Sequence, residues 1–190
     1  MLRMAFGLRG FERKAPPKPN PKMLLTFAIG KAIHAILQEK YHLFGKEVLF
    51  EDEIEITPDT SPVAEQYSIT GHADGKFTDL VSGTTLGLEI KSMSGKRFAV
   101  LDITDHNKDQ ATLYMVCMSV DYMMFVLVDK SNSNIESKLY KFDKERWKNL
   151  SAKLDNLMVK VMLGEEIPKS PNYIVCNTMC NYYWCCRPEV

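Results

Sequence analysis

The sequence predicts a single domain of the mixed α/β or α+β class, in which helices flank a central β-sheet. Three observations lead to this prediction. The 190 residues suit one domain of ordinary size. Hydrophobic residues make up 45% of the chain and charged residues 25%, as in soluble globular proteins. The hydrophobic pattern gives the order helix, three strands, helix, two strands, helix.

The first half of the chain begins with an arm rich in proline up to Pro21, which disfavours a helix there. Apolar residues at helical spacing then predict a helix from Met23 to about His42. The segment Val81–Thr84 has the composition of a turn, so the strands on either side of it are expected to form a hairpin. The three expected strands are Leu49–Ile56, Tyr67–Leu80 and Thr85–Met93.

The second half of the chain contains two helices separated by two strands. Residues 94–103 are expected to form a loop, after which Thr104 or Asp105 can cap a helix that runs to about Ser119. Asp143 can cap the last helix, which Gly164 ends. The expected strands are the apolar segment Tyr122–Asp129 and the edge strand Glu136–Phe142.

Charge is distributed unevenly, although 24 basic and 24 acidic residues give a net charge of zero. Residues 1–46 hold nine Lys and Arg against two acids, and residues 47–82 hold nine acids against one Lys. The balance excludes a uniformly basic nucleic-acid coat, but a basic arm followed by an acid-rich region suits a protein that binds a polyanion and a metal. Solvated faces of opposite charge are the alternative.

We therefore divide the single domain 1–190 into a basic arm (1–22), a core (23–164) and a Cys-rich tail (165–190). No signal peptide is recognisable, and no apolar run approaches the roughly 20 residues that span a membrane. The sequence predicts an intracellular protein without a membrane partner, located in the cytoplasm, or in the host cytoplasm if it is viral. In that compartment clustered cysteines bind metal more often than they form disulfides.

The most informative residues are Asp74, Glu89 and Lys91. The period of two places Glu89 and Lys91 on one face of a strand, and the hairpin brings Asp74 beside Glu89. Two neighbouring carboxylates repel each other unless a cation lies between them, and Mg²⁺ or Mn²⁺ prefers such oxygen ligands. Lys91 would then orient water or stabilise charge on a phosphate. A plain ion pair across the sheet is the alternative for Glu89 and Lys91.

Polar residues also recur at helical spacing on the first two helices. Gly30 and His34 are four residues apart on the first helix, and Gln110 and Tyr114 share one face of the second. A histidine on an apolar helix is often a structural residue of the core. Matched polar stripes on two helices beside a hairpin that carries carboxylates favour a functional site.

These motifs, in this order, resemble the RecB-like branch of the PD-(D/E)XK nucleases, which includes CRISPR spacer-acquisition exonucleases and related phage and mitochondrial exonucleases. The matching elements are Gly30-x-x-x-His34, Gly71-His72-Ala73-Asp74-Gly75, Glu89-Ile90-Lys91-Ser92, Gln110-x-x-x-Tyr114 and the C-terminal cysteines. The resemblance spans about residues 27–186. Ala73 stands where the family name has proline, a departure that this branch commonly tolerates.

The resemblance implies a restriction-endonuclease-like core and a role for each residue. His34, Asp74, Glu89 and the carbonyl of Ile90 would hold Mg²⁺ or Mn²⁺, and Lys91 would be the catalytic lysine. Gln110 and Tyr114 would position DNA and that lysine. In the arm, Arg3, Arg9, Arg13 and Lys14 would contact DNA phosphates.

The tail holds four of the five cysteines: Cys176, Cys180, Cys185 and Cys186. Such spacing suits a [4Fe–4S] cluster, which the resemblance favours, or Zn²⁺. Packed thiols without a ligand are the alternative. In the family the fourth cysteine precedes the first helical region, and this arm has none. Besides zinc, three explanations stay open: Cys185 and Cys186 both ligate, the fourth ligand is not a cysteine, or the chain lacks an upstream segment that carries the missing cysteine. Cys176, Cys180 and Cys186 are the favoured ligands.

The expected function is metal-dependent exonuclease hydrolysis of single-stranded or frayed DNA, in recombination, repair, or phage or CRISPR DNA processing. DNA is the expected substrate, and recombination or CRISPR proteins are candidate partners. Two alternatives stay open, namely a non-catalytic DNA-binding or recombination module and a structure-specific endonuclease.

Overall fold

The computed structural model describes residues 21–101 and 103–165. The chain consists of two compact units, Phe27–Lys148 and a second unit of Met1–Thr26 with Asn149–Val190. The first unit carries the whole sheet. Its strands are β1 (Val48–Ile56), β2 (Gly71–Asp79), β3 (Thr85–Met93), β4 (Tyr122–Asp129) and β5 (Ile135–Lys141).

The five strands form one mixed sheet in the order β1-β2-β3-β4-β5. Only β3 and β4 are parallel, with Glu89 beside Phe125 and Lys91 beside Leu127, and the other neighbours are antiparallel. The crossover from β3 to β4 runs through the helix α5 (Asp105–Met118), as a parallel connection requires. This sheet confirms the α+β class predicted from the order of elements.

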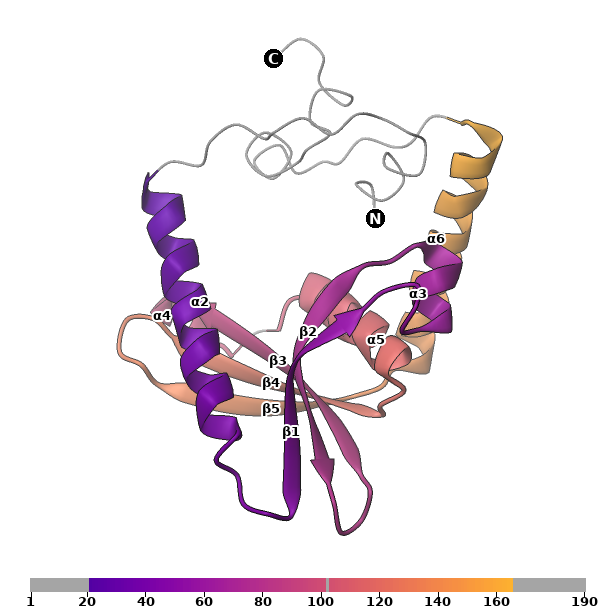
Figure 1. Ribbon diagram of the computed structural model, residues 1–190. Coiled ribbons are helices and arrows are strands. Elements are labelled where there is room, and N and C mark those ends of the chain that lie inside the picture. Colours follow the sequence, from indigo (N-terminus) through magenta and orange to yellow (C-terminus); the bar gives the residue numbers. More distant parts are fainter. Residues whose placement is uncertain (1–20, 102, 166–190) are drawn as a thin grey trace. The chain divides into compact units, whose positions relative to one another are not determined.

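Helices cover both faces of the sheet (Figure 1). On one face, α2 (Pro21–Tyr41) packs through Ile33, Leu37 and Tyr41 against the buried side chains of Phe50, Phe77, Leu88, Ile90, Val126 and Val128. On the other face, Ala111 and Met115 of α5 pack on Met123, Phe125 and Leu127. Successive β4 residues therefore face opposite layers, which explains why this strand is apolar throughout.

Capping residues set the helix ends much as the sequence predicts. Thr104 caps α5 by accepting a bond from the backbone N–H of Asn107. Asp143 accepts bonds from the N–H groups of Glu145 and Arg146 at the start of α6 (Lys144–Leu163), which buries Leu150, Leu154 and Leu157. Gly164 follows with φ 70°, a conformation that glycine adopts readily.

Two short helices correct the expected element boundaries. The first, α3 (Pro62–Tyr67), replaces the start of the strand expected from Tyr67, so that β2 begins at Gly71. The side chain of Ser61 caps α3, and Pro62 occupies its first turn. The second, α4 (Gly95–Phe98), lies within the expected loop 94–103. Both helices are too short for a hydrophobic period to reveal them. Among the described helices none is long and apolar enough to cross a membrane.

Candidate active site

Asp74 lies where β2 and β3 separate. The ladder between these strands runs from Thr78 beside Thr85 to Gly75 beside Leu88, and no pair follows. Beyond this point the Oδ2 atom of Asp74 accepts the bond that the backbone N–H of Ile90 would otherwise lack, at 2.6 Å. A carboxylate thus replaces a main-chain partner, which satisfies a buried donor and fixes the side chain.

The helix α2 holds Asp74 from the other side. His34 Nδ1 lies 3.1 Å from Asp74 Oδ1, and one turn later Gln38 Nε2 donates to the Asp74 carbonyl at 2.8 Å. The hydrogen bond to Asp74 raises the pKa of His34, which favours the charged imidazolium beside the carboxylate. Gly30 lies on the same helix near Ser92, whose Oγ would be 3.6 Å from a Cβ placed there.

Glu89 and Lys91 form an ion pair on β3. The Glu89 side chain is 4% exposed and that of Lys91 26% exposed, so the lysine stem leads from the carboxylate toward solvent. Burial raises the pKa of Glu89 to about 7, against the opposing effect of Lys91. The protein thus keeps a carboxylate in surroundings that disfavour its charge, as catalytic sites often do.

Gln110 and Tyr114 of α5 extend this arrangement. Lys91 Nζ donates to Gln110 Oε1 at 3.3 Å, and Gln110 Nε2 donates to the Tyr114 hydroxyl at 3.3 Å. Burial raises the pKa of Tyr114, which therefore remains a neutral phenol. Its hydroxyl lies against Gly71, where a Cβ would be 3.1 Å away. The two helical residues hold the lysine through a relay of neutral groups.

We call this arrangement the split-sheet network. It consists of His34, Gln38, Asp74, Glu89, Lys91, Gln110 and Tyr114. Two helices and two strands contribute to it, and residues as far apart as 34 and 114 come together. The sequence predicted six of these seven residues as candidate site residues. The exception is Gln38, which lies one turn after His34 on α2. The expected carbonyl ligand belongs to Ile90, whose N–H is bonded to Asp74.

The carboxylates of this network are bonded to protein groups. Within residues 21–101 and 103–165, no three His, Cys, Asp or Glu side chains are arranged so that they could hold a metal ion. Asp74 contacts His34 and Ile90, while Glu89 contacts Lys91. The chemistry of the donors, two carboxylates and one imidazole, is nevertheless of the kind that divalent cations take.

Several expected site residues lie outside the described residues. These are the arm residues Arg3, Arg9, Arg13 and Lys14 and the tail cysteines Cys176, Cys180, Cys185 and Cys186. The remaining cysteine, Cys117, is a half-buried free thiol on α5, packed beside the buried Ile56, Ala64 and Ala73. Burial raises the pKa of Cys117, so its thiol remains protonated and unreactive at neutral pH.

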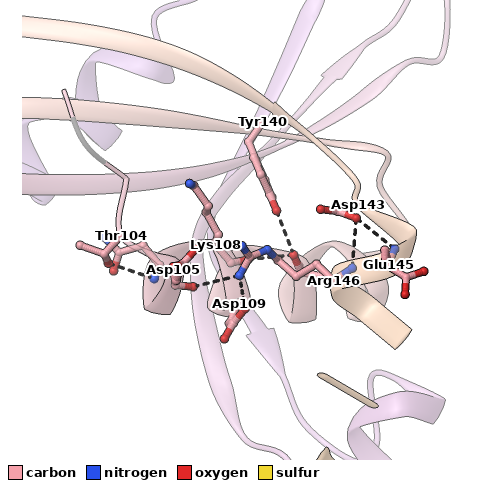
Figure 2. A network of polar contacts seen from close by, with 10 residues as sticks. Thr104, Asp105, Lys108, Asp109, Tyr140, Asp143, Glu145 and Arg146 are labelled. Atoms are coloured by element: carbon pink, nitrogen blue, oxygen red, sulfur yellow. Dashed lines mark hydrogen bonds and ion pairs between the residues drawn. The ribbon is translucent and has the colours of Figure 1, made fainter. Parts of the chain in front are cut away.

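The sequence did not reveal a second polar cluster, at the start of α5 (Figure 2). Arg146 at the beginning of α6 binds Asp105 at 2.8 Å and also binds Asp109, one turn along α5. We call these three residues the Arg146 clamp. The two aspartates raise the pKa of Arg146. The spacing of Asp105 and Asp109, four residues apart, indicates that they share one face of the helix. The sequence around them does not indicate which basic residue binds them.

Glu53 is a second residue that the sequence did not reveal. It lies in β1 with φ 48°, and its Oε1 atom accepts a bond from Gln38 Nε2 at 3.0 Å. In the sequence it is one of several acids on an alternating strand, and only its backbone conformation distinguishes it.

Comparison with known proteins gives similarity at the level of the fold. No protein-family model matches the sequence, and no curated protein sequence matches it. The crystal structure of SSO0001 aligns with 90% of this chain and 72% of its own, at 18% identity and a TM-score of 0.53. LHK-Exo in complex with dAMP covers 70% of this chain and 67% of its own, at 12% identity and a TM-score of 0.55.

A further structure of LHK-Exo, an alkaline exonuclease from Laribacter hongkongensis, aligns over the same shares at 11% identity and a TM-score of 0.53. These identities are low, so the similarity concerns the arrangement of the sheet and its helices. The fold is α+β, with a mixed five-stranded sheet of the restriction-endonuclease-like type.

Proposed function

We propose that this protein is a divalent-metal-dependent deoxyribonuclease that acts as an exonuclease on single-stranded or frayed DNA ends. The observation that carries the proposal is the split-sheet network. In it two carboxylates from diverging strands and a lysine two residues beyond one of them are held by two helices. The fold similarity to an alkaline exonuclease supports the same reaction class.

Mg²⁺ or Mn²⁺ is the proposed cofactor, with Asp74, Glu89, His34 and the Ile90 carbonyl as its ligands. Their chemistry fits, because oxygen donors dominate the set. Burial raises the pKa of Glu89, so a cation bound beside it would stabilise the ionised carboxylate. A bound divalent cation would supply Lewis-acid chemistry, which polarises a phosphodiester and makes water easier to deprotonate. Binding would replace the Lys91 ammonium as the partner of Glu89.

The protein's own groups have separate tasks in this proposal. Lys91 places a positive charge at the exposed end of the network, where it would stabilise charge that develops on the phosphate. Gln110 fixes the ammonium, and Tyr114 fixes the amide of Gln110. His34 holds one oxygen of Asp74, and the Ile90 N–H holds the other. Each reacting group is therefore oriented before substrate arrives.

DNA contacts are proposed for Lys96 and Arg97 in addition to the basic arm. Both side chains lie on α4, which follows β3 directly, and both are exposed. Close packing fixes α4, because a Cβ on Gly95 would be 3.0 Å from Ser131 Oγ and 3.1 Å from Asp129 Oδ2. Two exposed cations on a closely packed helix, a few residues beyond Lys91, suit contact with backbone phosphates.

A [4Fe–4S] cluster in the tail, with Zn²⁺ as the alternative, stays part of the proposal. Cys176, Cys180 and Cys186 would be its ligands, with Cys185 as the fourth candidate. Anaerobic purification with a visible spectrum and metal analysis tests it. A brown protein containing iron supports the cluster, a colourless one with one zinc supports the alternative, and the absence of both metals contradicts a metal-binding tail.

The decisive experiment compares the wild-type chain with Glu89→Gln on end-labelled linear DNA and on closed circular DNA. We expect degradation of linear single strands with Mg²⁺ or Mn²⁺, none with a chelator, and none by the variant. Cleavage of circular DNA would indicate an endonuclease instead. Binding of DNA without any turnover would contradict the proposal and support a binding module.

A further inference from the structure

Glu53 has an unusual conformation for a residue inside a strand. Its φ of 48° lies in the left-handed region, which is unfavourable for any residue with a Cβ. The flanking pairs, Asp52 beside Gly75 and Ile54 beside Ala73, place Glu53 opposite Asp74. Conformations of this kind persist only where their surroundings impose them, and they concentrate at functional sites.

The ribbon formed by β1 and β2 changes the layer against which it packs at this pair. On one side of it, Phe50 and Phe77 pack in the cluster that includes Leu37 of α2. On the other side, Ile56 and Ala73 pack with residues of α3 and α5. One face of the ribbon therefore passes from one layer to the other between these positions, which turns Asp74 away from the β2–β3 ladder and toward Ile90.

At this point β1 and β2 lie in close contact. A Cβ on Gly75 would lie 2.5 Å from the Phe50 ring and 2.9 Å from the Glu51 carbonyl, so only glycine fits there. The left-handed residue and the glycine thus occupy adjacent positions of the ribbon, one on each strand. Together they allow the ribbon to bend at Asp74.

Gln38 links the bend to the helix. Its side chain is buried, and Nε2 donates both to the Asp74 carbonyl at 2.8 Å and to Glu53 Oε1 at 3.0 Å. The bond to a carboxylate is the stronger kind. His34, one turn earlier, contacts the Asp74 side chain. The backbone of Asp74 and its carboxylate are therefore held from the same helix.

We propose that Glu53 and Gln38 form a latch that positions Asp74 for phosphodiester hydrolysis, an inference that rests on the proposed function. Glu53 contributes through Gln38 and through the bend, so it is a positioning residue. In this proposal a glutamate occupies the strained position because its carboxylate is needed to accept the hydrogen bond from Gln38. Glycine would relieve the strain but lose the acceptor.

This conflict gives a test in which activity and stability change in different directions. In Glu53→Gly, the left-handed backbone loses its penalty, so the urea midpoint should not fall. The kcat for DNA hydrolysis should fall about tenfold or more with KM for DNA nearly unchanged, because Asp74 is less well oriented. Mn²⁺ binding, followed by calorimetry in the absence of DNA, should weaken by about tenfold, since ordered ligands bind better.

Two further variants are controls for the latch. Glu53→Gln keeps an acceptor oxygen for Gln38 and should recover most of the kcat that the glycine variant loses. Glu55→Gly alters an exposed acid two residues further along the same strand. Unlike Glu53, Glu55 does not have a positive φ. This variant should lower stability, as glycine does inside strands, without changing kcat.

The outcomes separate the latch from the function beneath it. Wild-type kcat and Mn²⁺ affinity in Glu53→Gly would overturn the latch, as would a parallel loss of stability and activity. A wild-type chain that binds Mn²⁺ but cleaves no DNA would overturn the proposed function alone, and the latch would then stand or fall on the Mn²⁺ affinity of Glu53→Gly. A wild-type chain with neither property would overturn both.

Discussion

The helix α5 takes part in two polar networks that differ in burial and in what their charges achieve. Near its start, Asp105 and Asp109 bind Arg146, and the Asp105 side chain is 81% exposed. The next residue after Asp109, Gln110, joins the split-sheet network, in which the Glu89 side chain is 4% exposed. The Arg146 clamp lies near the surface, whereas the split-sheet network holds a carboxylate where burial disfavours its charge.

The difference supports the choice of the split-sheet network as the proposed catalytic site. An exposed ion pair contributes little to stability and is easily replaced. A buried carboxylate costs free energy, and it is retained where chemistry requires it. The pKa shifts of the two networks agree with this difference. Burial raises the pKa of Glu89 to about 7, which disfavours its charged form, whereas hydrogen bonds to Asp109 and Asp105 raise the pKa of Arg146, which favours its charged form.

The largest effect is expected from Lys91→Met, which leaves the Glu89 carboxylate buried without its ammonium. At pH 8, we expect the free energy of unfolding to fall by about 3 kcal/mol, as for other broken buried pairs. Nuclease activity should be lost as well. Urea unfolding and the DNA assay measure the two effects.

The double variant Glu89→Gln/Lys91→Met is the matched control. It removes both charges, so most of the stability should return while activity stays absent. A wild-type urea midpoint in Lys91→Met would show that the pair is no more costly to break than an exposed one.

A smaller effect is expected at α4, the short helix that follows β3. Lys96→Ala/Arg97→Ala should weaken single-stranded DNA binding about tenfold and reduce the slope of log affinity against log salt by about two. Fluorescence anisotropy across a salt series measures both quantities. Lys46→Ala, in the turn between α2 and β1, is the control and should change neither. An unchanged slope in the double variant would exclude phosphate contact by α4.

At the Arg146 clamp, the effect should be on stability alone. Arg146→Met should lower the free energy of unfolding by about 1 kcal/mol, since Asp105 and Asp109 remain solvated after the change. In a double-mutant cycle with Asp109→Asn, the double variant should lose less free energy of unfolding than the two single variants lose in total. A fall in kcat at unchanged stability would mean that the clamp belongs to the catalytic machinery after all.

The smallest effect concerns Asp79, an exposed carboxylate in the turn between β2 and β3. Bonds from the N–H groups of Ser82 and Val81 hold its pKa below the usual range. Because the folded-state pKa is lowered, this stabilisation is present above the unfolded pKa of about 3.9 and is lost as pH falls through the folded value.

Asp79→Asn reports that contribution directly. The urea midpoints of wild type and variant should differ slightly at pH 7 and converge at pH 3. A difference that persists unchanged at pH 3 would show that the charge of Asp79 contributes nothing.

Sequence reasoning succeeded where a local period or cap carries the information. A continuous apolar run predicted the strand Tyr122–Asp129 to the residue, and Thr104 and Asp143 marked two helix starts. It failed for α3 and α4, whose six and four residues are too few for a hydrophobic period to repeat. The gathering of Asp74, Glu89 and Lys91 was predictable because a hairpin and a period of two link them.

The sequence by itself determined the α+β class, the sites of the caps and most of the polar residues that meet in the split-sheet network. Only the tertiary structure decided which partner each one takes. Gln38 reaches Glu53, and Arg146 reaches Asp109, across 15 and 37 positions of sequence. Periods and caps are local, whereas the bend at Glu53 arises from packing against two opposite layers, which no single segment encodes.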